Sequence, residues 1–105
     1  MKKLDFPVRL PEARGPVTSL GVISTSLDEL VTRFGQHHEE ERDPSRVPGP
    51  TKYWGFEVGG GQKVIIEFAG VKEMADIYAD PPDLDAAVRG LGLPESCIIW
   101  RAPKR

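Results

Sequence analysis

The sequence predicts an α+β fold, in which a mainly antiparallel sheet of about five strands carries two helices in the order β-α-β-β-β-α-β. The alternating segment Thr51 to Ala69, interrupted by three glycines, is typical of a β-hairpin. Residues 26–35 and 83–92 carry the apolar spacing of amphipathic helices. Ten prolines and eleven glycines predict short elements joined by many turns. A chain of 105 residues suits one domain, so we expect a single domain over 1–105.

The hairpin predicts its own register. The inward side chains of both arms fall on even positions, namely Trp54, Phe56, Val58, Val64, Ile66 and Phe68. Even residues can pair with even residues only across a loop of odd length, which Gly59 to Gly61 provides. Trp54 is then opposite Ile66, and a slip of one residue would turn the apolar set toward water. Glu57 is expected opposite Lys63 on the outer face.

Each predicted helix has a start and a stop signal. Ser26 and Glu29 form a capping box, and Gly35 is well placed to end the first helix. The buried stripe of that helix is expected to be Leu27, Leu30, Val31 and Phe34. Asp83 is expected to cap the second helix, and Gly92 to end it. Its stripe is expected to be Leu84, Ala87, Val88 and Leu91.

The remaining segments are assigned from their patterns. We expect a first strand over 17–24, and a last strand over 96–102 that is central and buries Trp100, because it is apolar on both faces. Residues 71–80 fit either a helix or a strand, and the short link after the hairpin favours an edge strand. Residues 1–16 are expected to form an extended arm, and 36–50 a long acidic loop.

Charge and composition exclude several classes of protein. The net charge is −2, but residues 26–45 carry −4, residues 67–85 carry −5 and residues 86–105 carry +3. Without a strong basic patch we expect no nucleic-acid partner, and acidic segments favour a basic protein partner. No apolar run approaches the roughly 20 residues of a membrane helix, and no apolar region follows Lys2 and Lys3. With a single cysteine, these features predict a cytoplasmic protein that does not contact a membrane.

None of the polar clusters matches a catalytic or ligand-binding motif. His37 and His38 precede three glutamates, but Arg42 stands where an HExxH zinc motif needs its second histidine. Cys97 lies in an apolar segment, which is typical of an inert buried thiol. Gly59 to Gly61 lack the spacing of a phosphate loop and lead into a strand. We therefore expect no catalytic, metal or cofactor-binding residue and no cofactor.

The chain resembles the small immunity proteins of bacterial polymorphic toxin systems in size, charge and element order. The stretches that carry the resemblance are Leu20 to Ile23, Tyr53 to Phe56, and Ile77 to Leu84. The resemblance implies a non-catalytic protein that binds and neutralises a cognate toxin, and it assigns no site residues.

From the residues themselves, the expected contacts with a partner are Glu39, Glu40, Glu41, Asp43, Tyr53, Tyr78, Asp76 and Asp80. The aromatic members are included because aromatic side chains are enriched at interface hot spots. Two alternatives stay open. One is a small enzyme or metal-binding protein that uses residues 36–43, and the other is an adaptor that pairs through a sheet edge.

Overall fold

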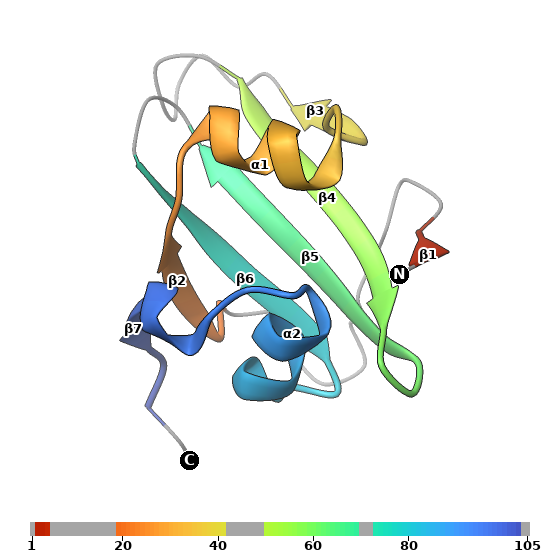
Figure 1. Ribbon diagram of the computed structural model, residues 1–105, viewed down its shortest axis with the longest axis vertical. Helices are drawn as coiled ribbons and strands as arrows, with labels where there is room; N and C mark the ends of the chain where they lie inside the picture. The colour runs from red at the N-terminus through yellow and green to blue at the C-terminus, as the bar shows by residue number, and fades with distance from the viewer. Residues whose placement is uncertain (1, 5–18, 42–49, 70–72, 104–105) are drawn as a thin grey trace.

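The computed structural model describes residues 2–4, 19–41, 50–69 and 73–103. Its elements are β1 (Lys2–Lys3), β2 (Gly21–Ser24), α1 (Leu27–Phe34), β3 (Glu39–Glu41), β4 (Thr51–Val58), β5 (Gln62–Ala69), β6 (Met74–Asp80), α2 (Leu84–Gly90), the 3₁₀ turn η2 (Glu95–Cys97) and β7 (Ile98–Arg101). Every strand pairing is antiparallel, and the sheet order is β1-β4-β5-β6-β2-β7, with β3 also paired to β4. Both helices lie on the same face of this sheet (Figure 1).

The predicted hairpin is confirmed in its register. Trp54 pairs with Ile66, Phe56 with Val64, and Glu57 with Lys63. The turn depends on glycine, because Gly59 and Gly61 have φ values of 55° and 106°, in a region that L side chains rarely adopt. The three-residue loop therefore sets the parity that turns one side of both strands toward the helices.

The predicted N-terminal caps of both helices are also confirmed. The Ser26 hydroxyl accepts a hydrogen bond from the Glu29 amide at 3.1 Å, and an Asp83 carboxylate oxygen accepts one from the Ala86 amide at 3.1 Å. Gly35, with φ of 82°, follows the last residue of α1. These caps satisfy backbone groups that the ends of short helices leave unpaired.

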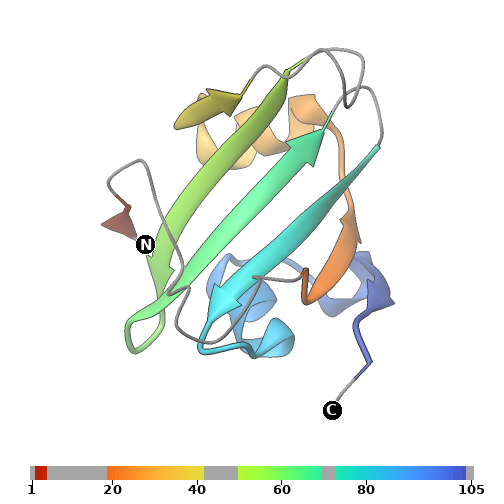
Figure 2. The same ribbon diagram turned by 180° about the vertical axis from the view of Figure 1, so that it is seen from behind.

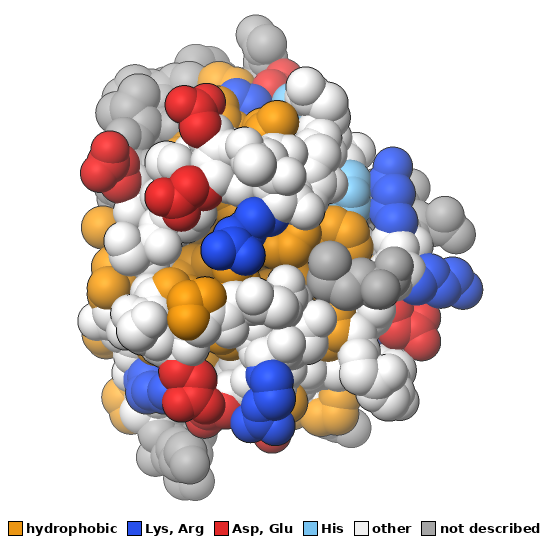
Figure 3. All heavy atoms as spheres, in the orientation of Figure 1, with side chains coloured by type: hydrophobic (Ala, Val, Ile, Leu, Met, Phe, Trp, Pro, Cys, Tyr) orange, Lys and Arg blue, Asp and Glu red, His pale blue; other side chains and the backbone are white. Residues whose placement is uncertain are grey.

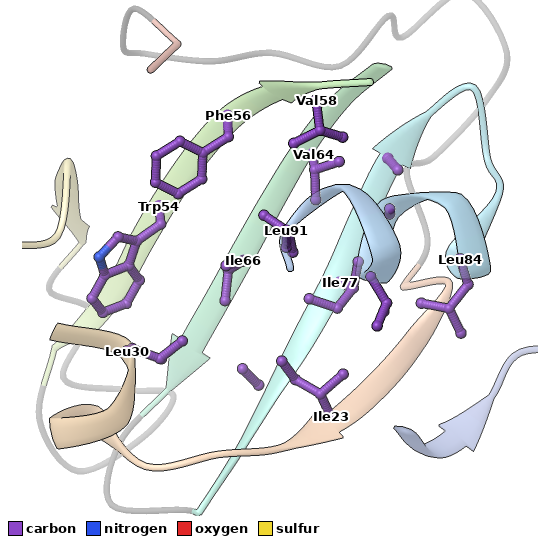
Figure 4. Packing of buried hydrophobic residues seen from close by; sticks show 14 of the residues in the cluster. Ile23, Leu30, Trp54, Phe56, Val58, Val64, Ile66, Ile77, Leu84 and Leu91 are labelled. Atoms are coloured by element: carbon purple, nitrogen blue, oxygen red, sulfur yellow. The ribbon is translucent and has the colours of Figure 1, made fainter. Parts of the chain in front are cut away.

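The core lies between the helices and the sheet. Figure 4 shows Trp54, Phe56 and Ile66 pointing from the strands toward α1 and α2. Trp54 has no solvent exposure, and its indole Nε1–H donates to the Gly35 carbonyl at 3.0 Å, which ties the end of α1 to β4. Hydrophobic side chains remain visible at the surface between the two helices (Figure 3). Phe34 and Leu93 are half-buried and pack against the core.

The structure has more strands than the sequence predicts. Lys2 and Lys3, placed in the extended arm, form β1 beside β4, and Glu39 to Glu41, placed in the long loop, form β3 on the same edge of β4. Both added strands are too short to show a period, so their pairing depends on the edge that β4 presents. Of the strand expected over 17–24, only Gly21–Ser24 is a strand, and residues 17 and 18 lie outside the described residues.

The predicted positions of the last two strands are wrong. β6 is a strand, as favoured, but it is central, because it pairs with β5 on one side and β2 on the other. β7 is at the end of the sheet order rather than in its centre. Its register against β2 shifts so that Ile98 pairs with Ile23 while Trp100 pairs with Val22. This irregularity turns Trp100 away from the core, and its side chain is 48% exposed.

Candidate functional site

Strand alternation gathers acidic and aromatic side chains on the sheet face that is turned away from α1 and α2. Figure 2 shows this side, with the strands in front of the helices. Cross-strand pairing sets a row across five strands, because Glu39 pairs with Tyr53, Tyr53 with Glu67, Glu67 with Asp76, and Asp76 with Val22. Side chains of paired residues point to the same side of a sheet, so this row lies on one face.

A second row lies further along the same strands. Lys2 pairs with Glu57, Glu57 with Lys63, and Lys63 with Asp80. Together the two rows contain the carboxylates of Glu39, Glu57, Glu67, Asp76 and Asp80 and the ammonium groups of Lys2 and Lys63. Five negative and two positive charges give this face −3 among the described residues. We call it the acidic face, defined by these seven residues with Tyr53, Ile65 and Tyr78.

Tyr78 lies between the two rows, opposite Ile65. Burial raises the pKa of the Tyr78 phenol above its usual value of 10.0, and the negative charges of Glu67 and Asp76 raise it further. The phenol also makes a side-chain hydrogen bond with Glu67. Ile65 is only 8% exposed although it points away from the helices. The centre of the acidic face is thus packed and apolar, and the charges surround it.

Exposed apolar side chains continue this face at the end where β7 lies. Trp100 is paired with Val22, and Met74 is paired with Ser24, so both lie beside the row that includes Asp76. Their exposures are 48% and 40%. Sequence reasoning placed Trp100 in the core and gave Met74 no role in binding. An acidic face with an apolar margin can attract a positively charged protein surface and then bury apolar area against it.

The residues singled out from the sequence are only partly brought together. Glu39, Tyr53, Asp76, Tyr78 and Asp80 all lie on the acidic face. Glu40, next to Glu39 on β3, points to the opposite side by strand alternation and lies 3.7 Å from His37 Nε2. Glu41 belongs to the same strand, but the structure does not describe its side chain, and Asp43 is outside the described residues.

Glu57 and Glu67 were missed, although the hairpin already assigns both to its outer face. The signal that could have found them is strand alternation. Like Tyr53, both have odd residue numbers, so all three side chains point to the same face of the hairpin. Their relation to Asp76 could not be found in this way, since it depends on the pairing of β5 with β6. That pairing joins segments whose register no local turn determines.

The two histidines lie in the link between α1 and β3, and this link runs beside the edge of β4. The His37 ring contacts the Trp54 ring edge-on with centroids 6.1 Å apart, and the His38 ring contacts the Phe56 ring edge-on at 5.0 Å. Within the described part of the chain, no group of three His, Cys, Asp or Glu side chains is arranged to hold a metal ion.

Cys97 is half-buried in η2, not in the last strand as expected, and it packs against the core. Burial raises the pKa of its thiol above the usual value. This thiol is therefore protonated at neutral pH and is a poor nucleophile.

Comparison with protein-family models, with curated proteins and with solved structures gives no match to this chain. None of the described helices combines the length and apolar character needed to cross a membrane.

Proposed function

We propose that this protein is a non-catalytic binding module of the immunity-protein type, which neutralises a basic toxin domain by covering it with the acidic face. The observation that carries the proposal is the register that places Glu39, Glu57, Glu67, Asp76 and Asp80 on one face with a net charge of −3. Enzymes that act on nucleic acids carry positively charged clefts, and an acidic surface of this kind is complementary to them.

The acidic face carries −3 among the described residues, and this charge attracts a positively charged partner. Attraction of this kind raises the association rate and weakens with salt, since the Debye length falls from about 10 Å at 0.1 M to about 3 Å at 1 M.

The apolar members of the surface supply the short-range part of binding. Trp100 and Met74 are exposed at the margin, and Tyr53 and Tyr78 are half-buried among the carboxylates. Tryptophan and tyrosine are over-represented among residues that dominate binding energies, because they bury large area at little entropic cost. The sheet-edge adaptor is less well supported, because β7 has four residues and an irregular register, features that protect edges from added strands.

The test compares two double charge reversals that change the net charge equally. Glu39→Lys/Asp76→Lys alters the acidic face, whereas Glu73→Lys/Glu95→Lys alters two exposed acids outside it. The partner is sought as the product of the neighbouring reading frame, co-expressed with this chain and purified as a complex. Association and dissociation rates are then measured across a salt series.

We expect the first variant to slow association by roughly tenfold at low salt and to change dissociation less, as is usual for charges at an interface. The control should slow association much less. Equal effects of the two variants, or an association rate that salt does not change, would refute binding through the acidic face. If the neighbouring product neither co-purifies with the chain nor loses toxicity in its presence, the immunity role is refuted.

A further inference from the structure

A gap in the pairing of β4 is filled by an imidazole ring. On the edge of β4 that faces away from β5, β3 pairs with Thr51 to Tyr53, and β1 pairs with Phe56 and Glu57. Neither strand supplies a backbone acceptor for the amide of Gly55. That amide donates instead to Nδ1 of His38 at 3.0 Å.

Other hydrogen bonds place this ring at the junction of three segments. The His38 amide donates to the Tyr53 carbonyl at 2.8 Å, immediately before β3 begins. The Leu4 amide donates to the Gly55 carbonyl at 3.0 Å, just after β1. The same residue, Gly55, is therefore held through its amide by His38 and through its carbonyl by the N-terminal segment.

The bond to Gly55 requires a neutral imidazole. A backbone N–H can donate to Nδ1 only when that nitrogen carries no proton, so the tautomer in this site bears its proton on Nε2. Burial lowers the pKa of His38 below its usual value of 6.5, and the nearby positive charge of Lys3 lowers it further. Protonation would replace an acceptor by a second donor facing the Gly55 amide.

The charged groups around the ring agree with this direction. Lys3 on β1 and His37 beside the ring both disfavour a positive charge on His38. The β4 residues in contact with the ring, Gly55 and Phe56, carry no charge. Glu40, the acid that β3 brings to this side, lies at 3.7 Å from His37 Nε2.

We propose that His38 is a pH-sensitive latch that holds the segment from Gln36 to Glu41, including β3, on the edge of β4 when neutral and releases it when protonated. Because the folded pKa is the lower one, the stabilisation is fully present above pH 6.5 and is lost as the pH falls through the folded pKa. Release would move Glu39 away from Tyr53 and uncover backbone groups of β4.

The experiment follows the unmodified protein by NMR from neutral to acidic pH. The chemical shifts of the imidazole nitrogens give the tautomer and the pKa of His38. Hydrogen exchange of the Gly55 and His38 amides, corrected for intrinsic rates, shows whether the segment is held on β4 or released. We expect an Nε2–H tautomer, a pKa below 6.5, and exchange of both amides accelerated by about tenfold once His38 is protonated. The amide of the fully buried Ile66 should stay protected over the same range.

Two variants distinguish the contribution of His38 to this pH dependence from that of His37. Asparagine can place its side-chain oxygen near the position of Nδ1 and does not titrate, so His38→Asn should keep slow exchange at Gly55 without a pH step. His37→Asn should retain the step. An Nδ1–H tautomer, a His38 pKa of 6.5 or above, a step that persists in His38→Asn, or loss of Ile66 protection together with Gly55 would each overturn the latch.

Discussion

The two tryptophans of this chain should differ sharply in their contribution to stability. Trp54 has no exposed surface and Trp100 is 48% exposed, although both lie in strands. Replacing a fully buried aromatic by alanine costs about 3–5 kcal/mol through lost transfer energy and the cavity that remains. We therefore expect Trp54→Ala to lower the free energy of unfolding by that amount, and Trp100→Ala to lower it by less than about 1 kcal/mol.

The hydrogen bond of Trp54 adds little to this cost. Its acceptor is the carbonyl of Gly35, an exposed residue, so water can replace the indole N–H there. A neutral hydrogen bond of this kind contributes about 1 kcal/mol. Trp54→Phe, which keeps a six-membered ring and loses this bond, should accordingly cost about 1–3 kcal/mol.

Urea unfolding followed by circular dichroism measures all three variants against the unmodified protein. The slope of free energy against urea should stay constant, so that differences in midpoint report stability alone. A loss of 3–5 kcal/mol is large against a total of about 5–15 kcal/mol, so Trp54→Phe provides a value even where Trp54→Ala fails to fold. A cost below about 1 kcal/mol for Trp54→Ala, or equal costs for Trp54→Ala and Trp100→Ala, would refute the placement of Trp54 in the core and of Trp100 on the outer face.

Further predictions concern packing and ionisation. Gly90→Ala should destabilise the protein by about 1–2 kcal/mol in urea melts despite the better helix propensity of alanine, because the new Cβ would lie 2.5 Å from Val58 Cγ2. Gly60→Ala should change stability by less than about 0.5 kcal/mol, because the new Cβ would have no atom within 4 Å. A larger loss for Gly60→Ala than for Gly90→Ala would contradict the close packing of Gly90 against Val58. Tyr78 should ionise above pH 10.0, so its stabilisation is present below that pH and is lost as the pH rises through the folded pKa. Ultraviolet titration of the unmodified protein and of Tyr78→Phe checks this, because the difference between the two curves reports the ionisation of Tyr78. A midpoint of that difference at pH 10.0 or below would contradict the prediction.

Local signals in the sequence were sufficient for the hairpin and for both helices. The register of Trp54 against Ile66 follows from the parity of two apolar sets and the length of one turn, all within a short segment. The helix starts follow from Ser26 and Asp83, whose side chains act within their own first turns. Such features need no information about distant parts of the chain.

The order of strands in the sheet could not be obtained in this way. Alternation in β6 indicates which side chains point toward the helices, but it does not indicate whether a strand lies on one side or on both. Apolar residues on both faces of β7 suggested a central strand, whereas the shift between Ile98 and Trp100 provides an alternative reason for that pattern. For the same reason, several residues of the acidic face were identified one by one without the register that joins them.

The β4–β5–β6 meander has a consequence for the time course of folding. Its three strands follow one another along residues 51–80, so they can associate after closing only short loops. β2 and β7 come from distant parts of the chain, and β2 must pair with the free side of β6, and β7 with β2, before the sheet is complete. We expect the meander to form the folding nucleus, with the strand that carries Trp100 docking last. Trp100, at the apolar margin of the acidic face, would then be the final part of the binding surface to be assembled, while Met74 and the carboxylates on β4, β5 and β6 are already in place.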